Sequence, residues 1–99
     1  MVQINWTFQA KNDLKDIADY ISKDSKLYAK RQVLKIRSRT DILKSQSYSG
    51  RMVPEIQDEN IREIPEGNYR IIYRVMNENR IDILTVHHSS RDLRKRKIE

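Results

Sequence analysis

Cysteine is absent from this 99-residue chain, which excludes disulfide bonds, thiolate catalysis and zinc sites made of cysteine. Glycine and proline are scarce, with two residues of each, and the chain is too aliphatic for a disordered protein. No apolar run approaches the roughly 20 residues of a membrane-spanning helix, so a transmembrane protein is excluded. The N-terminal MVQINWTFQA carries no secretory pattern, and a cytoplasmic location is therefore expected.

Positive charge is in excess and unevenly distributed. The chain has 20 Lys and Arg against 14 Asp and Glu, a net charge of +6. Residues 23–44 hold eight basic residues against two acidic ones, a net +6, and residues 91–99 carry a net +3. Residues 51–68 hold two arginines against five carboxylates, a net −3. A small protein with this balance favours a polyanionic or acidic partner.

The first half of the chain changes from a strand pattern to a helix pattern. Val2, Ile4 and Trp6 alternate with polar residues, which predicts a half-buried strand. From Thr7, a suitable N-cap, apolar residues recur at helical spacing as far as Ile21. The acidic residues expected on the solvent face of this helix are Asp13, Asp16 and Asp19.

A second helix follows after a short break. Asp24 or Ser25 can cap it, and its apolar residues recur at spacings of three and four between Ala29 and Leu43. Because the link between the two helices is short, an antiparallel helix hairpin is the simplest topology.

The second half of the chain has the pattern of strands. Residues 52–56 and 60–64 are short candidates, and Pro54 indicates an edge position for the first. Residues 69–76 and 80–87 are longer and alternate around a turn, which predicts an antiparallel pair. Since both of these strands have apolar residues on both faces, we expect them in the centre of the sheet.

These elements predict an α+β protein of the order β-α-α-β-β-β, in which a helix hairpin packs on one face of an antiparallel sheet. The other face is then expected to be free for a partner or substrate. We expect residues 1–99 to form a single domain, with the basic tail at 91–99 either a short helix or disordered.

The basic second helix is the largest charged feature, and two interpretations remain open. It is either a solvated face or a docking surface for nucleic acid or an acidic partner. The sequence has no helix-turn-helix glycine turn, RNA-binding aromatic signature or GxxG loop, so known nucleic-acid modules are disfavoured. The candidate partner-binding residues of the basic surface are Lys30, Arg31, Lys35, Arg37, Arg74, Arg94 and Arg96.

Arginines in the predicted strands form another candidate site. Arg70 and Arg74 have the same strand parity and should project from one face, and Arg62 lies in a neighbouring strand. Arginines gathered on a sheet face could hold a phosphate group bidentately. The alternative is ordinary cross-strand ion pairing, for which the candidate partners are Glu63, Asp82 and Glu78.

His87 and His88 are the only histidines. Neighbours in a strand face opposite sides of the sheet, so at most one of them serves a given surface. An imidazole could act as a general acid or base, although a histidine near the end of a strand is more often only hydrogen-bonded. The pair lacks the spacing of metal ligands, and no P-loop, GxSxG or paired-carboxylate pattern is present. We therefore expect no metal ion and no cofactor.

Four segments, taken in order, resemble the RelE/ParE superfamily of toxins from bacterial type II toxin–antitoxin modules. They are ADYI, GRMVPE, IREIPEGNYRIIYRV and IDILTVHHSSRDL, and the most specific parts are GNYRIIYRV and the H-x-x-R-D from His88 to Asp92. The likeness covers essentially the whole chain. It implies a small cytoplasmic toxin that causes growth arrest and plasmid stabilisation. The cognate antitoxin neutralises the toxin and supplies the binding of operator DNA.

Members of this superfamily divide by target. RelE-like toxins cleave mRNA in the ribosomal A site without a metal ion. If this chain is RelE-like, the resemblance makes Arg62, Arg70, His88 and Arg91 its catalytic residues. The chain departs from that pattern, because it lacks a closely spaced lysine pair in the strand of Arg62 and has no tyrosine after His88.

ParE-like toxins have a long helix hairpin, lack the nuclease residues and inhibit DNA gyrase. The two long helical patterns, Trp6 and the DL-x-x-I-x-x-YI series beginning at Asp13 are more similar to ParE. The resemblance thus favours a gyrase inhibitor, with a ribosome-dependent mRNA endonuclease as the alternative. A degenerate toxin that only binds its antitoxin is a third possibility. In each case operator DNA is contacted only through the antitoxin, and no membrane is involved.

Overall fold

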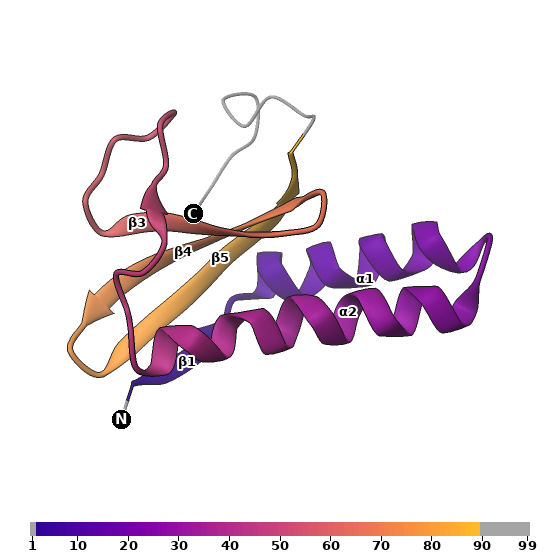
Figure 1. Ribbon diagram of the computed structural model, residues 1–99, viewed down its shortest axis with the longest axis horizontal. Helices are drawn as coiled ribbons and strands as arrows, with labels where there is room; N and C mark the ends of the chain where they lie inside the picture. Colours follow the sequence, from indigo (N-terminus) through magenta and orange to yellow (C-terminus); the bar gives the residue numbers. More distant parts are fainter. Residues whose placement is uncertain (1, 90–99) are drawn as a thin grey trace.

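A helix hairpin and a twisted five-stranded sheet form the two layers of the protein (Figure 1). The computed structural model describes residues 2–89. No helix in this part of the chain is long and apolar enough to cross a membrane. The elements in order are β1 (Gln3–Trp6), α1 (Phe8–Ser22), α2 (Lys26–Arg39), the 3-10 helix η1 (Thr40–Lys44), β2 (Arg51–Met52), β3 (Ile61–Glu66), β4 (Tyr69–Asn77) and β5 (Arg80–His88).

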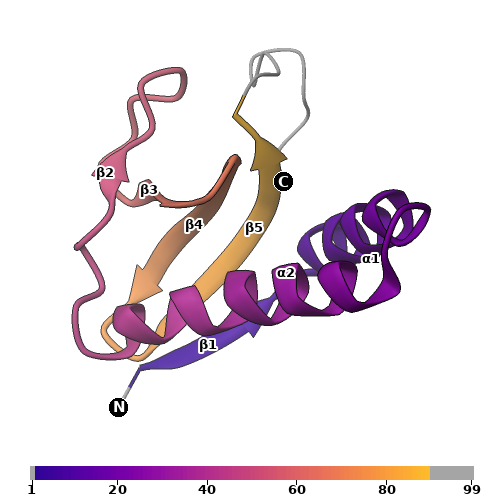
Figure 2. The same cartoon turned by 45° about the vertical axis from the view of Figure 1, so that its right-hand side comes forward.

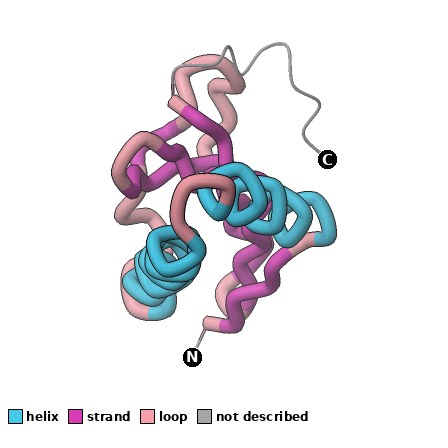
Figure 3. Tube along the Cα trace, turned by 90° about the vertical axis from the view of Figure 1, so that its right-hand side faces the viewer, coloured by secondary structure: helices cyan, strands magenta, loops and turns pink. Residues whose placement is uncertain are grey.

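Each helix of the hairpin has an N-cap residue whose side chain accepts a hydrogen bond from the first turn. The hydroxyl of Thr7 accepts a hydrogen bond from the backbone N–H of Ala10 at 3.2 Å, and that of Ser25 accepts one from Tyr28 at 3.1 Å. Helices α1 and α2 lie side by side, as the view along the hairpin shows (Figure 3). The predicted helix hairpin is confirmed, and Ser25 is the cap of its second helix.

The sheet has the strand order β1-β5-β4-β3-β2, which places the two long strands in its interior as predicted. The α+β class is confirmed, with two differences from the expected arrangement. Four strands follow the helices, and β1 pairs in parallel with β5, from Gln3↔Arg80 to Trp6↔Ile83. The sheet is therefore mixed. The connection from β1 to β5 contains the helix hairpin and three other strands, so it does not impose the antiparallel pairing that a hairpin turn requires.

The main core lies between the hairpin and one face of the sheet. Tyr73 is fully buried there, in the alternation predicted for residues 69–76. The other buried members of this core are Ala10, Leu14, Ile36, Leu43, Ile64, Ile71, Val75, Ile81, Ile83 and Val86.

The opposite face of the sheet is not free, which corrects the expectation of an open surface. Val53 and Ile56 pack against a second apolar cluster made of Ile61, Ile72 and Leu84. The predicted strand at 52–56 is also corrected, because β2 ends at Met52 and the chain then turns. Pro54 has no backbone N–H to continue a ladder, and residues 53–60 instead form a strap across this face.

Asp13 is buried rather than solvent-exposed, contrary to the sequence prediction. Strand β1 ends opposite Ile83, so the second half of β5 has an unpaired edge. The carboxylate of Asp13 accepts a hydrogen bond from the backbone N–H of Val86 at 3.0 Å and another from the Thr85 hydroxyl. Helix α1 thus supplies, through Asp13, the acceptor for the N–H of Val86 that a neighbouring strand would otherwise supply.

Candidate functional site

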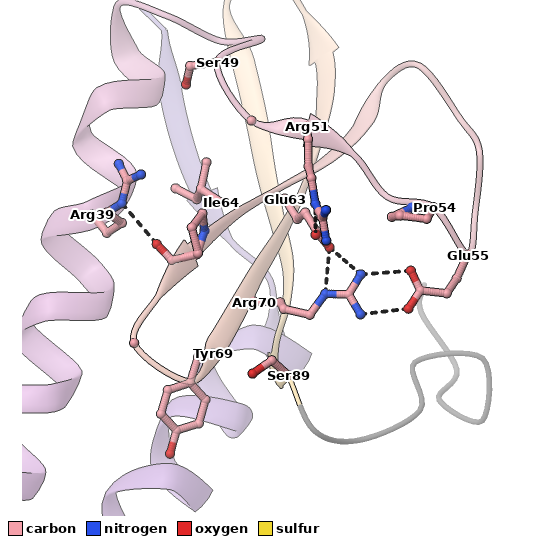
Figure 4. Close-up of a pocket in the computed structure, with 13 residues that line it drawn as sticks. Arg39, Ser49, Arg51, Pro54, Glu55, Glu63, Ile64, Tyr69, Arg70 and Ser89 are labelled. Atoms are coloured by element: carbon pink, nitrogen blue, oxygen red, sulfur yellow. Dashed lines mark hydrogen bonds and ion pairs between the residues drawn. The ribbon is translucent and has the colours of Figure 1, made fainter.

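A cleft of about 650 Å³ lies between the end of α2 and the strands β2, β3 and β4 (Figure 4). Three arginines line it, one from α2, one from β2 and one from β4, together with two carboxylates from the strap and from β3. These residues are Arg39, Arg51, Arg70, Glu55 and Glu63.

Arg70 is the centre of this arrangement. Its Nη1 and Nη2 donate to the two carboxylate oxygens of Glu55 at 2.8 and 2.9 Å, and its Nε donates to Glu63 at 2.7 Å. The guanidinium is thereby held between the strap and β3, as the dashed lines of Figure 4 show. Only 13% of the Arg70 side chain is exposed. Of the two interpretations of Arg70, phosphate binding and cross-strand ion pairing, its guanidinium adopts the ion pair with Glu63.

Glu63 has a second arginine partner. Its side chain is 5% exposed, and its other carboxylate oxygen accepts a hydrogen bond from Arg51 Nε at 2.6 Å. Two guanidinium groups and two carboxylates thus form a connected cluster, the Arg70 cluster, with no net charge. A carboxylate as buried as that of Glu63 needs such partners, because an unpaired buried charge is strongly destabilising.

The Arg70 cluster keeps its groups ionised. Hydrogen bonds from Arg70 lower the pKa of Glu55 from 4.5 to about 2, although burial opposes this shift. The same bond to Glu55 raises the pKa of Arg70 above its ordinary value. Neither group can therefore exchange a proton near neutral pH, so the pair is suited to binding and positioning rather than to acid–base catalysis.

Arg39 and Arg62 contact backbone carbonyls at two ends of β3. Arg39 Nε donates to the carbonyl of Pro65 at 3.1 Å. Arg62 donates to the carbonyls of Glu59 and Gly50, each at 3.0 Å, and its guanidinium stacks over the ring of Tyr48 at 5.0 Å. Arg62 thus holds loops against the sheet.

The histidines at the end of β5 are separated, as expected from strand alternation. His87 is buried, and His88 is half-buried with its ring edge-to-face against Tyr69 at 5.4 Å. Strand registry pairs Arg70 with His87 and Tyr69 with His88. Arg70 therefore lies on the face of the sheet that the strap covers. His88 lies on the opposite face and packs on Tyr69, which borders the main core.

Among the described residues predicted to be catalytic, Arg62 and Arg70 lie on opposite faces of the sheet. Arg62 alternates with Ile61 and Glu63, so it lies on the face opposite Arg70. Arg91, the fourth candidate, lies outside the described residues.

The predicted basic surface is exposed along α2 and continues only partly onto the sheet. Arg74 is half-buried in β4, and Asp82, opposite it, bonds to Arg80 at 2.8 Å instead. Arg94 and Arg96 fall outside the described residues. The exposed basic residues of α2 include Lys30, Arg31, Lys35 and Arg37.

Sequence reasoning missed Glu55, Arg51 and Arg39 as parts of the cleft. Glu55 lies in the strap, and no periodicity connects a loop residue to a strand 15 positions away. A weak signal existed for Glu63, because a charged residue between Ile61 and Ile64 in a strand needs a cross-strand partner. Among residues 2–89, no group of three or more His, Asp or Glu side chains could hold a metal ion.

Comparisons with known proteins identify the family that this chain resembles. The family described as ParE toxin of type II toxin–antitoxin system, parDE, matches residues 4–93. Toxin RelE2 of Caulobacter vibrioides is 32% identical over 91 residues, which cover 92% of this chain and 99% of that protein. The chromosomal ParDE system from P. aeruginosa contains a chain with a TM-score of 0.73 and 23% identity, over 89% of this chain and 96% of that one. This last similarity supports the fold.

Proposed function

This chain belongs to the ParE toxin family of type II toxin–antitoxin systems, and we propose that it arrests growth by binding DNA gyrase rather than by cleaving mRNA. As a type II toxin it has a cognate antitoxin for a partner. The proposed target places its action in the cytoplasm, where gyrase meets the chromosome.

The observation that carries this proposal is the neutralised state of Arg70. A ribonuclease of this superfamily would use the strand arginine to stabilise negative charge on a phosphate in the transition state. In this chain two carboxylates already occupy the donors of Arg70, at 2.7 to 2.9 Å. Binding RNA there would require breaking a bidentate ion pair and leaving Glu63 with fewer partners.

The placement of the remaining candidates supports the same proposal. Arg62 lies on the opposite face of β3 from the Arg70 cluster, and His88 packs its ring on Tyr69. General acid–base catalysis needs the catalytic groups within hydrogen-bond reach of one reacting phosphate. The sequence after His88, SSRDLRKRKIE, also contains no tyrosine that could stack on a base.

Exposed cations on α2 are the surface that we assign to target docking. The helix carries six Lys and Arg and no acidic residue between Lys26 and Arg39. Arg31 and Lys35 are both exposed on the outer side of the hairpin, one turn apart. A protein–protein contact through such a surface depends on charge and shape and requires no catalytic group.

A supercoiling assay tests the proposal. Purified wild-type chain should inhibit DNA supercoiling by gyrase, and addition of its antitoxin should restore the activity. The double variant Arg31→Glu, Lys35→Glu should lose most of the inhibition while keeping its melting temperature. The matched control His88→Ala should inhibit gyrase to within about twofold of wild type, since the proposal gives His88 no role in chemistry.

Mapping of mRNA 5′ ends in the minutes after induction tests the nuclease alternative. The gyrase proposal expects growth arrest with intact messages. Cuts phased to the reading frame, and lost in a folded His88→Ala variant, would overturn it in favour of ribosome-dependent cleavage. Expression that causes no growth arrest, no inhibition of gyrase and no cleavage of mRNA would also overturn the gyrase proposal.

A further inference from the structure

Helix α2 carries positive charge that the fold does not neutralise. Its six Lys and Arg residues have no acidic neighbour within the helix. The ion pairs within residues 2–89 use Lys44, Arg51, Arg70 and Arg80, and none of them uses a cation of α2. Like charges on neighbouring helical turns repel one another, and an anionic partner relieves that repulsion.

Apolar side chains lie on the same exposed face of α2. Leu27, Tyr28 and Leu34 have 60%, 57% and 55% of their surface exposed. A helix face that serves only to keep a protein in solution carries polar residues at such positions. Exposed leucines among unpaired cations are therefore typical of a contact surface.

The cations of α2 form two rows, one on each side of the exposed leucines. Successive helical residues are about 100° apart, so positions seven apart lie nearly on one line along the helix. Leu27 and Leu34 form such a line, and the cations lie about 60–70° from it on either side. The first row contains Lys30 and Arg37, and the second row contains Arg31 and Lys35.

Contacts with the sheet agree with the direction of each row. Arg37, in the first row, stacks over the ring of Trp6 in β1 at 5.2 Å. Arg39, one turn after the second row ends, donates to the carbonyl of Pro65 in β3 at 3.1 Å. Strands β1 and β3 are separated by β5 and β4 in the sheet, so the two rows face different sides. Figure 2 shows α2 on the outside of the molecule, crossing in front of β1.

The shape and charge of this face fit the major groove of duplex DNA. That groove is about 12 Å wide, and a helix with its side chains is about 10–12 Å across. Phosphates line both walls of the groove, so a helix within it needs cations on both flanks. The floor of the groove presents thymine methyl groups among the base edges, and apolar side chains pack against them. The two rows and the leucine line supply these groups in this order.

An acidic protein fits the same face less well. Protein interfaces have a core from which charged residues are depleted. Helix α2 instead carries charge of one sign from Lys26 to Arg39, a length of about 21 Å. Uniform charge over this length matches the uniform charge of a nucleic acid backbone. A second copy of the chain has the same positive excess and is repelled.

We propose that α2 lies in the major groove of duplex DNA, with the first row on the phosphates of one strand and the second row on those of the other. The DNA is the duplex that gyrase holds, so this inference rests on the proposed function and adds DNA to the surface that the toxin contacts. Phosphate contacts carry no sequence information, so the binding is independent of base sequence.

Titration of a fluorescent duplex of about 20 base pairs with the purified chain, in the absence of gyrase, tests the inference. Anisotropy should give a Kd of about 1–100 µM at physiological salt. Four phosphate contacts predict that the logarithm of the binding constant falls with the logarithm of the salt concentration with a slope of about −3.6.

The two proposals fail in different ways in this measurement. No binding of duplex DNA at low salt, by a preparation that still inhibits gyrase, would overturn the DNA inference and assign α2 to a protein surface. Binding of duplex DNA by a preparation that does not inhibit gyrase would support the site on α2 and refute the gyrase target.

Glutamine substitutions distinguish the two rows from the general charge of the chain. Loss of either row removes two phosphate contacts and should reduce the magnitude of the salt slope by about 1.8. The control pair lies on the exposed side of α1, removes the same charge and should change the affinity less than about twofold. The variants are Lys30→Gln with Arg37→Gln, Arg31→Gln with Lys35→Gln, and, as the control, Lys11→Gln with Lys15→Gln.

Two results of this comparison would overturn the inference, provided that the melting temperatures show folded variants. Equal slopes for all three pairs would show a diffuse attraction between DNA and a basic protein. A loss confined to one row would show that α2 lies against a single strand and outside the groove.

Duplex RNA of the same sequence tests insertion into the groove. It has the same backbone charge as DNA, but its major groove is too narrow for a helix to enter. The chain should therefore bind duplex RNA at least about fivefold more weakly than duplex DNA at the same salt concentration. Equal affinity for the two duplexes would overturn the placement of α2 in the major groove.

Discussion

Arg70 and Glu55 face each other through two parallel hydrogen bonds of 2.8 and 2.9 Å, which join an interior strand to the strap. The pair fastens residues 53–60 over the second apolar cluster, and it does so beside Glu63, which is nearly inaccessible to solvent.

Removing the guanidinium of Arg70 should destabilise the protein. Arg70→Gln leaves Glu63 buried with Arg51 as its remaining guanidinium partner and frees Glu55, so we expect a loss of about 3 kcal/mol in the free energy of unfolding. Urea denaturation measures this loss. Arg74→Gln, in the same strand, should cost less than about 1 kcal/mol. If both variants unfold at the same urea concentration, the Arg70 cluster contributes nothing particular to stability.

Acid should weaken the strap through Glu55. Its pKa of about 2 in the folded protein lies below the ordinary value of 4.5, so ionised Glu55 stabilises the folded state. This contribution is fully present above about pH 5 and is lost as the pH falls toward 2. At neutral pH, Glu55→Gln should cost about 1–2 kcal/mol, because the group is partly exposed to solvent.

The pH dependence of this difference distinguishes the ion pair from a packing effect. Thermal unfolding of wild type and Glu55→Gln should converge as the pH is lowered from 5 to 2. Glu78→Gln, a change of the same kind in the exposed turn between β4 and β5, should follow wild type throughout. A constant gap between wild type and Glu55→Gln at every pH would contradict the assignment.

The buried carboxylate of Asp13 should secure the edge of β5. Asp13→Ala leaves the N–H of Val86 and the hydroxyl of Thr85 without this acceptor, and we expect a loss of about 2–3 kcal/mol. Amide exchange at Val86 should accelerate in the variant. Asp16→Ala, on the exposed side of the same helix, is the control and should leave both quantities nearly unchanged. Wild-type protection of Val86 in Asp13→Ala would disprove this role.

The two glycines should respond differently to substitution. A Cβ on Gly50 would lie 2.5 Å from the carbonyl oxygen of Glu63 and 2.8 Å from the hydroxyl of Tyr73. That hydroxyl also accepts the N–H of Gly50 and donates to the carbonyl of Ser47. Gly50→Ala should therefore cost about 3 kcal/mol or more, as measured by denaturation.

Gly67 provides the comparison. It has a φ of +58°, and a Cβ added there would meet open space, so Gly67→Ala causes only backbone strain, which costs about 1 kcal/mol. A Gly50→Ala variant as stable as Gly67→Ala would show that the loop at Gly50 moves away from β3 without penalty.

Local patterns predicted most of the fold. The alternation from Tyr69 to Met76 predicts a strand in the centre of the sheet, and Ser25 is one of the two caps that the sequence offers for the second helix, because both signals depend on near neighbours in the sequence. The direction of β1 relative to β5 was not predictable in this way. It depends on a pairing between residues almost 80 positions apart, for which no turn residue supplies a signal.

The site was predicted less completely than the fold. Arg70 was identified as a candidate, and its ion pair with Glu63 was among the alternatives, since both residues lie in strands with a visible parity. Glu55 was missed because the strap has no period, and Asp13 was misplaced because hydropathy treats every carboxylate as solvent-seeking. A charged side chain is buried where the fold supplies a hydrogen-bonding or oppositely charged partner, and only the tertiary structure shows where that partner lies.

The pairing of β1 with β5 also sets the order in which the protein can be completed. Strand β1 finds its neighbour only when residues 80–83 have been synthesised. Until then the apolar side chains of Ile4 and Trp6 have no strand to join, and the α-helical hairpin lacks the central part of its sheet. The sheet of the nascent chain therefore stays incomplete until β5 has been synthesised. The folded toxin therefore cannot exist before the ribosome has passed residue 83.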